Sequence, residues 1–234
     1  MNKYKSPNFD LRSGGVKYLI MHYTGMASGQ EALERLCDEE AAVSAHYVIE
    51  ENGQVYSLVD EYKRAWHAGV SKWENNEDIN DLSIGIEIVN TGHPYPGYES
   101  VYQEFPDVQM RAVISLAKDI MARHDINPWD VIGHSDVAWR RKIDPGELFD
   151  WKRLALEGIG IWPDETQELN HSEVNTNDFL KKAKLYGYDI EGCHKNPEAL
   201  VSAFQRHFRQ NSFDGILDHE TILILDNLLT KKFS

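Results

Sequence analysis

The chain has 234 residues, with 24 lysines and arginines against 38 aspartates and glutamates, which gives a formal net charge of −14 at pH 7. This acidic balance argues against generic binding to nucleic acids or anionic membranes, because both partners are polyanions. Only two cysteines are present, which excludes a disulfide framework and a four-cysteine zinc site, so any metal would have to be held by carboxylates and some of the ten histidines.

The N-terminal region contains no apolar segment long enough for a signal peptide or a spanning helix. Its nearest apolar run, residues 16–21, is short and is interrupted by Lys17. We therefore expect a cytoplasmic protein without a membrane span. An exported or periplasmic location is the alternative if the chain is a processed form.

The first predicted elements are a buried strand, a helix and a hairpin. Residues 16–23 form an apolar, aromatic-rich run that predicts a strand, with His22 near its end. A Ser-x-x-Glu pattern indicates the start of a helix over 28–40. An Asn-Gly dipeptide lies between two short apolar runs, 45–49 and 54–59, and predicts a β-hairpin.

The next part of the chain alternates between strand and helix patterns. Residues 82–89 place three isoleucines on one face of a strand and Glu87 on the other. Apolar residues at helical spacing predict a helix over 108–124, and 131–133 predicts a short strand before a helix over 147–157. This order indicates an α/β fold, with a mixed central β-sheet flanked by helices.

The composition changes near residue 163. Residues 1–163 are predicted to form one domain, and the polar, acidic segment 164–176 a linker. Residues 177–234 carry three short helical patterns, which predict a small C-terminal three-helix domain.

Two histidines and an aspartate are candidate metal ligands. His22 and His134 each follow an apolar strand pattern, and Asp144 lies ten residues beyond His134, before a Pro-Gly turn. Each residue taken alone is more simply a core, edge or turn residue. Two imidazoles and one carboxylate together are a ligand set of catalytic zinc sites, in which the fourth position is left for water.

Two further residues could complete such a site. Glu87 lies on the face opposite the isoleucines and could act as the general base, although a glutamate on a solvated sheet face is the simpler alternative. Lys142 lies two residues before Asp144 and could stabilise an oxyanion, although it is also part of a basic surface stretch.

Six segments, in the same order along the chain, resemble those of zinc-dependent N-acetylmuramoyl-L-alanine amidases of the AmpD and AmiD type, whose fold is shared with peptidoglycan recognition proteins. Each segment alone is a weak signal, but the set is specific and covers most of residues 15–160. The segments are MHYTGM (21–26), VSAHYVIEENGQVYSLV (43–59), RAWHAG (64–69), SIGIEIVN (83–90), VIGHSD (131–136) and KIDPG (142–146).

The resemblance implies one zinc ion per chain, held by His22, His134 and Asp144 at the floor of a groove. It implies Glu87 as the general base and Lys142 as the oxyanion stabiliser. The implied reaction is hydrolysis of the amide bond between N-acetylmuramic acid, in its ordinary or 1,6-anhydro form, and L-alanine. The implied partner is peptidoglycan or a muropeptide, in cell-wall turnover or recycling.

Four residues are candidates for substrate contact. His67 lies in a segment that borders the groove in the family. Asn90 could bond the peptide stem, and Trp66 could stack on sugar, although a buried tryptophan is the commoner case. His46 is a further candidate, which competes with the interpretation of a buried histidine bonded to backbone. The remaining histidines are expected to be surface or core residues: His93, His124, His171, His194, His207 and His219.

The C-terminal region has its own resemblance. Residues 178–229 resemble a small peptidoglycan-binding helical module, most clearly at 203–208 and 213–218. An amidase followed by such a module is more similar to the AmiD type than to the AmpD type. Three points are left open. They are whether the helices bind glycan, which form of the substrate is preferred, and which oligomer the chain forms.

Three competing hypotheses are kept, of which the first belongs to a different class of protein and the other two are enzymes. A non-catalytic peptidoglycan-binding module would share the fold but would lack a zinc ligand. A zinc peptidase would cut inside the stem peptide, and a phage-type endolysin would cut the same bond as an amidase.

Overall fold

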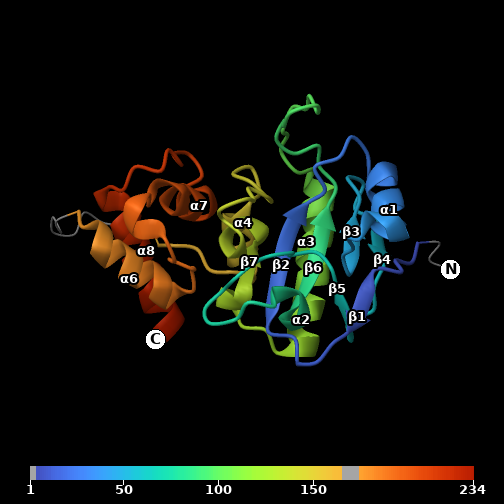
Figure 1. Cartoon of the computed structure of the whole chain (residues 1–234), viewed down its shortest axis with the longest axis horizontal. Coiled ribbons are helices and arrows are strands. Elements are labelled where there is room, and N and C mark those ends of the chain that lie inside the picture. The colour runs from blue at the N-terminus through green and yellow to red at the C-terminus, as the bar shows by residue number, and fades with distance from the viewer. Residues whose placement is uncertain (1–3, 165–173) are drawn as a thin grey trace.

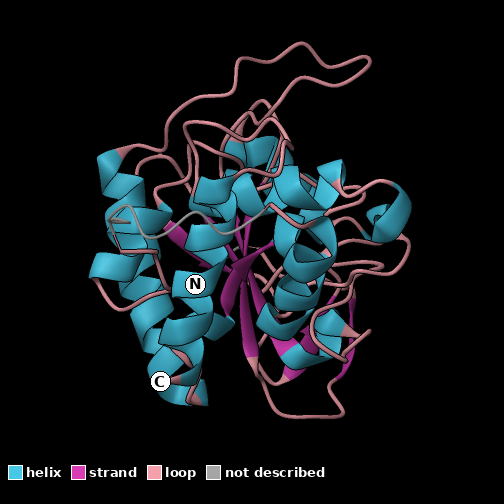
Figure 2. Cartoon of the chain, turned by 90° about the vertical axis from the view of Figure 1, so that its left-hand side faces the viewer, coloured by secondary structure: helices cyan, strands magenta, loops and turns pink. Residues whose placement is uncertain are grey.

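The structure is a computed structural model, which describes residues 4–164 and 174–234. A mixed sheet lies in the middle of the molecule with helices on both of its faces, and the C-terminal helices gather at one end (Figures 1 and 2). This arrangement confirms the predicted α/β fold class. Most of the predicted linker, at 165–173, lies outside the described residues, and the division into two domains stays a prediction.

The central sheet has five strands in the order β4-β3-β6-β2-β7. They are β2 (Tyr18–Tyr23), β3 (Tyr47–Ile49), β4 (Val55–Ser57), β6 (Ser83–Ile88) and β7 (Val131–Gly133). Strands β3 and β4 pair antiparallel across the predicted Asn-Gly turn. Strands β3, β6, β2 and β7 run parallel, so their carboxyl ends lie at one edge of the sheet.

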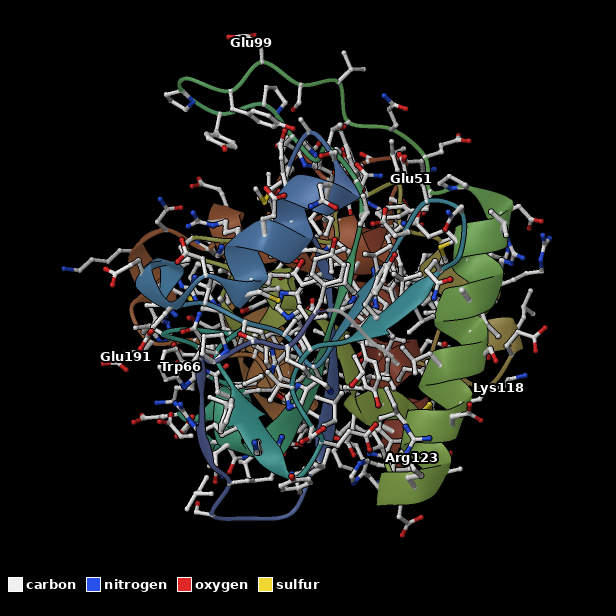
Figure 3. The ribbon with its side chains drawn as sticks, turned by 90° about the vertical axis from the view of Figure 1, so that its right-hand side faces the viewer. Glu51, Trp66, Glu99, Lys118, Arg123 and Glu191 are labelled. Atoms are coloured by element: carbon white, nitrogen blue, oxygen red, sulfur yellow. The ribbon has the colours of Figure 1, made fainter. Side chains whose placement is uncertain are left out.

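Helix α3 (Asp107–His124) covers one face of this sheet (Figure 3). Its buried residues, among them Val113 and Ile120, pack in one cluster with Ile84, Ile86 and Ile88 of β6. Because successive strand residues point to opposite faces, the side chains of His22 and Glu87 point away from α3.

Short elements surround the opposite face. Helix α1 (Gly29–Cys37) packs Leu33 and Leu36 against Val48 of β3. Strands β1 (Phe9–Leu11) and β5 (Lys63–Ala65) form a separate antiparallel pair. The one-turn helices α2 (Ile79–Leu82) and α4 (His134–Val137) lie directly before β6 and directly after β7.

The C-terminal helices share a hydrophobic core with the sheet. They are α6 (Thr176–Tyr186), α7 (Glu198–Phe208) and α8 (His219–Phe233). Phe179 and Phe204 belong to the same buried cluster as Tyr18 and Ile20 of β2 and as Trp73. The second face of the sheet is therefore partly covered by residues that lie more than a hundred positions away in the sequence.

One predicted helix begins later than expected. Helix α5 spans Trp151–Leu156 instead of 147–157, and the Asp150 side chain caps it by accepting from the Arg153 N–H at 3.0 Å. Gly146, at φ 84°, turns the chain just before this point, so residues 147–149 connect a turn to the helix. Within residues 4–164 and 174–234, none of the helices combines the length and apolar character needed to span a bilayer.

Candidate active site

The parallel strands bring the candidate residues to one edge of the sheet. His22 on β2 is the register partner of Glu87 on β6, and His134 directly follows β7 on the other side of β2. Asp144 lies in the loop after α4. The backbone of this loop is bonded to the segment that carries His134, because the Ser135 N–H donates to the Asp144 carbonyl at 2.8 Å. Rigid strand ends and one backbone bond therefore position these four side chains.

His22, His134 and Asp144 form a compact cluster. The two Nδ1 atoms lie 3.0 Å apart, and Asp144 Oδ2 lies 3.1 Å from His22 Nδ1 and 2.9 Å from His134 Nδ1. With ligand bonds of about 2.0 Å, two ligands of a tetrahedral zinc ion lie roughly 3.3 Å apart. The triangle of donor atoms therefore has the size that one zinc ion needs, and all three residues are buried.

The outer hydrogen bonds determine which ring nitrogens carry protons. His134 Nε2 lies 3.1 Å from the Ala68 carbonyl, an acceptor only, so this nitrogen carries the hydrogen and Nδ1 presents a lone pair. Ser83 donates its hydroxyl to the Ile79 carbonyl at 2.6 Å and can therefore accept from His67 Nε2 at 3.2 Å.

This chain of bonds continues to the second histidine of the cluster. With its hydrogen on Nε2, His67 accepts through Nδ1 from His22 Nε2, at 3.0 Å. His22 Nδ1 then also presents a lone pair. Burial, followed by the neighbouring His134, lowers the pKa of His22 to about 4, which favours the neutral ring.

With the ring hydrogens on these outer bonds, the cluster turns three lone-pair donors toward one another. Two neutral imidazoles and a carboxylate whose lone pairs converge within about 3 Å repel one another unless a cation lies between them. The donor set therefore fits a zinc ion, and the outer bonds of both imidazoles match the usual orienting shell of zinc ligands.

Glu87 and Lys142 line a cavity of about 700 Å³, which His134 and Asp144 also line. Burial, with the nearby Asp144, raises the pKa of Glu87 well above its ordinary value, and the charge of Lys142 opposes this rise. Glu87 Oε2 is buried and has no hydrogen-bond partner among the described residues. A carboxylate with a free oxygen is available to accept a proton from a molecule in the cavity. Two cavities elsewhere are larger, at about 900 and 920 Å³, but the histidine-aspartate cluster lines neither.

Two of the four candidates for substrate contact line this cavity. Trp66 is half-buried at its wall, and its Nε1 donates to Asp10 at 2.7 Å. His67 is buried at its floor, in contact with His22. A side chain at position 85 would reach within 2.4 Å of the His67 ring, so the glycine there makes room for this histidine.

The other two candidates, His46 and Asn90, are occupied by backbone contacts, and neither lines the cavity. His46 is fully buried, accepts at Nδ1 from the Gly85 N–H at 3.0 Å and has Nε2 3.1 Å from the Lys63 carbonyl. Asn90 donates to the Gln103 carbonyl and accepts from the Gly92 N–H, both at 2.9 Å. The alternative of a buried histidine bonded to backbone thus describes His46, and Asn90 anchors the loop that follows β6.

Sequence reasoning missed three residues that line the cavity: Tyr23, His93 and Tyr95. His93 Nδ1 lies 3.1 Å from the Tyr23 hydroxyl, and its Nε2 lies 3.1 Å from the Glu147 carboxylate. His93 and Tyr95 belong to the long loop that rises above the sheet in Figure 2, with Glu99 near its tip in Figure 3. A loop without periodicity carries no local signal that would place these side chains at a cavity.

Comparison with known proteins adds independent information. Residues 12–147 match the family model described as N-acetylmuramoyl-L-alanine amidase. The chain is 39% identical over 233 residues to N-acetylmuramoyl-L-alanine amidase AmiD of Escherichia coli, which covers 92% of this chain and 83% of AmiD. It is 32% identical to 1,6-anhydro-N-acetylmuramyl-L-alanine amidase AmpD of Haemophilus influenzae, over 64% of this chain and 87% of that protein.

Two similar solved structures contain a muropeptide. Escherichia coli AmiD, in complex with the substrate anhydro-N-acetylmuramic acid-L-Ala-D-gamma-Glu-L-Lys, superposes with a TM-score of 0.83 at 36% identity, over 94% of this chain and 91% of AmiD. AmpDh3 of Pseudomonas aeruginosa, in complex with anhydromuramic pentapeptide, gives a TM-score of 0.83 at 35% identity, over 99% of this chain and 97% of AmpDh3.

Proposed function

The chain belongs to the N-acetylmuramoyl-L-alanine amidase family, and from this premise we propose how its own residues hydrolyse the amide bond between N-acetylmuramic acid and L-alanine. The observation that carries the proposal is the convergence of three donor atoms, from His22, His134 and Asp144, next to a cavity that His134 and Asp144 line together with Glu87, whose carboxylate has a free oxygen. Such a cavity has the parts that hydrolysis of an amide requires.

We assign His22, His134 and Asp144 as the ligands of one zinc ion. When bound, zinc lowers the pKa of a water molecule to about 7 and polarises a carbonyl group. The protein's contribution is orientation, because the Ala68 carbonyl fixes the His134 ring, and the chain from Ser83 through His67 fixes the His22 ring.

Glu87 is assigned as the general base. Its raised pKa makes it a better proton acceptor than an exposed glutamate, and its unpartnered oxygen is the acceptor site. After taking the proton of the attacking water, Glu87 would return it to the amine of L-alanine as that group leaves. A positioned acid and base of this kind contributes about 10² to 10⁴ in rate.

Lys142 is assigned to stabilise the negative charge that develops on the scissile carbonyl oxygen. It lines the same cavity as Glu87, on the segment that also carries Asp144. Since the cationic side chain is in place before the reaction, it costs no reorganisation when the charge appears. Trp66 and His93, at the cavity wall, are available to contact the sugar or the peptide stem.

The 1,6-anhydro form of the sugar is the substrate form that we favour. Both solved relatives described above contain an anhydromuramyl peptide, and each covers more than nine-tenths of this chain. Hydrolysis of such a peptide belongs to cell-wall recycling. The expected cytoplasmic location stays a prediction, which cell fractionation would test.

The direct test is digestion of an anhydromuropeptide and of intact cell-wall sacculi by the purified, zinc-loaded protein, with the products identified by mass. We expect free anhydro-N-acetylmuramic acid and a peptide that begins with L-alanine. Products cut inside the stem peptide would show a peptidase instead, and binding without any product would show a non-catalytic recognition protein. Metal analysis of the same sample tests the zinc assignment separately.

A further inference from the structure

The C-terminal helices reach the segment that carries His134 through a buried carboxylate. Asp136 lies two residues after His134 and is fully buried. Its Oδ2 accepts from the Gly133 N–H at 2.7 Å and from His207 Nδ1 at 2.7 Å, and its Oδ1 accepts from the Tyr188 hydroxyl at 2.6 Å. Two of these three donors come from the part of the chain after residue 176.

Asp136 anchors the turn from which His134 projects. Its bond to the Gly133 N–H closes the turn between β7 and α4, so the residues on both sides of His134 are held by one carboxylate. Gly133 also packs against the second ligand segment, since a Cβ built there would lie 3.0 Å from Pro145, the residue after Asp144. A shift of Asp136 would therefore be transmitted to both ligand segments.

His207 is built into this position. It is buried on α7, and its ring stacks on Trp151 at a centroid distance of 3.9 Å. A buried carboxylate requires hydrogen-bond donors, because it has left water. His207 and Tyr188 supply what Asp136 cannot obtain from its own segment beyond the Gly133 N–H.

A second contact from α7 reaches the segment after Asp144. Arg206 pairs with the Glu147 carboxylate, with Nε 3.6 Å from Oε2. Glu147 in turn contacts His93, whose ring lines the cavity. Adjacent residues of α7, Arg206 and His207, therefore contact the segments that carry His134 and Asp144.

From these contacts we infer that α7 is a positioning element of the metal site, with His207 and Tyr188 acting through Asp136 on His134. This inference rests on the proposed zinc site. It gives the C-terminal helices a role in positioning the metal ligand His134, and this role is distinct from any binding of glycan. These residues do not touch the metal or the substrate, so they are positioning residues and not catalytic ones.

The test compares zinc affinity, measured by competition with a chromophoric chelator, across four variants of the full chain. His207→Phe keeps an aromatic ring against Trp151 but removes the donor to Asp136, and Tyr188→Phe removes one hydroxyl group. His207→Asn keeps an N–H donor close to the original Nδ1 position. The control is Ser202→Ala, which removes a hydrogen bond from α7 to the Phe213 carbonyl within the C-terminal helices.

We expect His207→Phe and Tyr188→Phe to weaken zinc binding about tenfold, with partial recovery in His207→Asn and no change in Ser202→Ala. The visible spectrum of the cobalt-substituted protein should shift in the first two variants, which a purely structural loss would not cause. If His207→Phe fails to fold, Tyr188→Phe carries the test.

Two outcomes separate the inference from its premise. Wild-type zinc affinity and an unchanged cobalt spectrum in both phenylalanine variants would overturn the role of α7 while leaving the zinc site intact. Absence of zinc binding in the wild-type protein would instead overturn the proposed function itself.

Discussion

Burial determines the chemistry of the single residues at the site. The same loss of solvent raises the pKa of Glu87 and lowers that of His22, because it disfavours the charged form of each group. A carboxylate that holds a proton more readily is a better general base near neutral pH, and an imidazole that stays neutral is a better metal ligand. One environment thus prepares both groups for their assigned roles.

Replacing the general base should separate metal binding from turnover. Glu87→Gln keeps the size of the side chain but cannot accept a proton, so we expect bound zinc to remain while kcat falls about 10² to 10⁴-fold. In the wild-type protein, kcat/KM should decrease as the pH falls through the raised pKa of Glu87, since the base must be ionised to act. Zinc content and steady-state kinetics check both points.

Glu99→Gln serves as the control for that variant, because Glu99 is exposed near the tip of the long loop (Figure 3). Turnover by Glu87→Gln at the rate of this control would exclude Glu87 as the base.

Removing the outer support of His22 should weaken the metal site. His67→Phe retains a ring of similar size but breaks the bond to His22 Nε2, so that the His22 tautomer is no longer selected. We expect zinc affinity to fall about 10- to 100-fold, as measured by chelator competition. The control is Trp66→Phe, because Trp66 also lies at the cavity wall but bonds to Asp10 and not to the histidine cluster. We expect this variant to bind zinc as the wild type does. An equal loss of zinc affinity in both variants would contradict the specific role of His67.

Among the elements, α3 is joined to the strands by a charged cluster at its C-terminal end. Glu61, in the loop between β4 and β5, accepts from the Tyr47 hydroxyl and from Arg123, both at 2.6 Å, and lies 2.7 Å from His124. Arg123 occupies the lower end of α3 in Figure 3. Burial would raise the pKa of Glu61, but these three partners lower it to about 2 from its ordinary value of 4.5.

The lowered pKa of Glu61 predicts that its contribution to the stability of the fold depends on pH. Because the pKa is lower in the folded chain, the stabilisation is complete above the unfolded value of 4.5 and is lost as the pH falls towards about 2. Because solvent screens this cluster, in which the Arg123 side chain is about half exposed, we expect a contribution of about 1 kcal/mol. Urea unfolding should show Glu61→Gln less stable than the wild type at pH 6, with a smaller difference at pH 3. The exposed Glu51→Gln should show no such trend, and a difference independent of pH would argue against the ionised cluster.

Across the whole molecule, the central sheet and the C-terminal helices are stabilised by one shared cluster. Trp73 is fully buried between them, and its ring lies 4.9 Å from that of Tyr188. The closeness of this packing is seen at Gly187, where a Cβ would lie 2.4 Å from the Trp73 ring. The two parts therefore depend on each other for burial of their apolar surface.

A chain that ends at residue 164 should lose its cooperative fold. Truncation uncovers large side chains such as Tyr18, Ile20 and Trp73, each worth about 1.5–3 kcal/mol when fully buried. Their sum is comparable with the roughly 5–15 kcal/mol that stabilises a typical domain. Near-ultraviolet circular dichroism and a thermal melt should show lost tertiary structure relative to the full chain; a sharp melt at the full-length temperature would contradict this prediction.

Local patterns were sufficient for the longer elements. The apolar run of β2, the alternation in β6 and the helical period of α3 are properties of consecutive residues, and the structure confirms them. The three-residue strands β1 and β5 lacked such a signal, because their pairing joins segments more than fifty residues apart. The start of α5 depends on a turn and a cap that hydrophobic periodicity does not describe.

The sequence alone determined the α/β fold, the family and the set of residues that could hold a metal, because strand and helix periods and the order of the six segments are written in consecutive residues. Only the tertiary structure decided which candidates meet. His67 bonds to His22, and His93 lies at the cavity wall. His46 and Asn90 are instead bonded to the backbone and do not line the cavity. The tertiary structure also brought His207, expected to be a surface or core residue, to Asp136. The reason is physical: a hydrogen bond requires two groups within about 3 Å, and for residues far apart in the chain, packing alone creates that proximity.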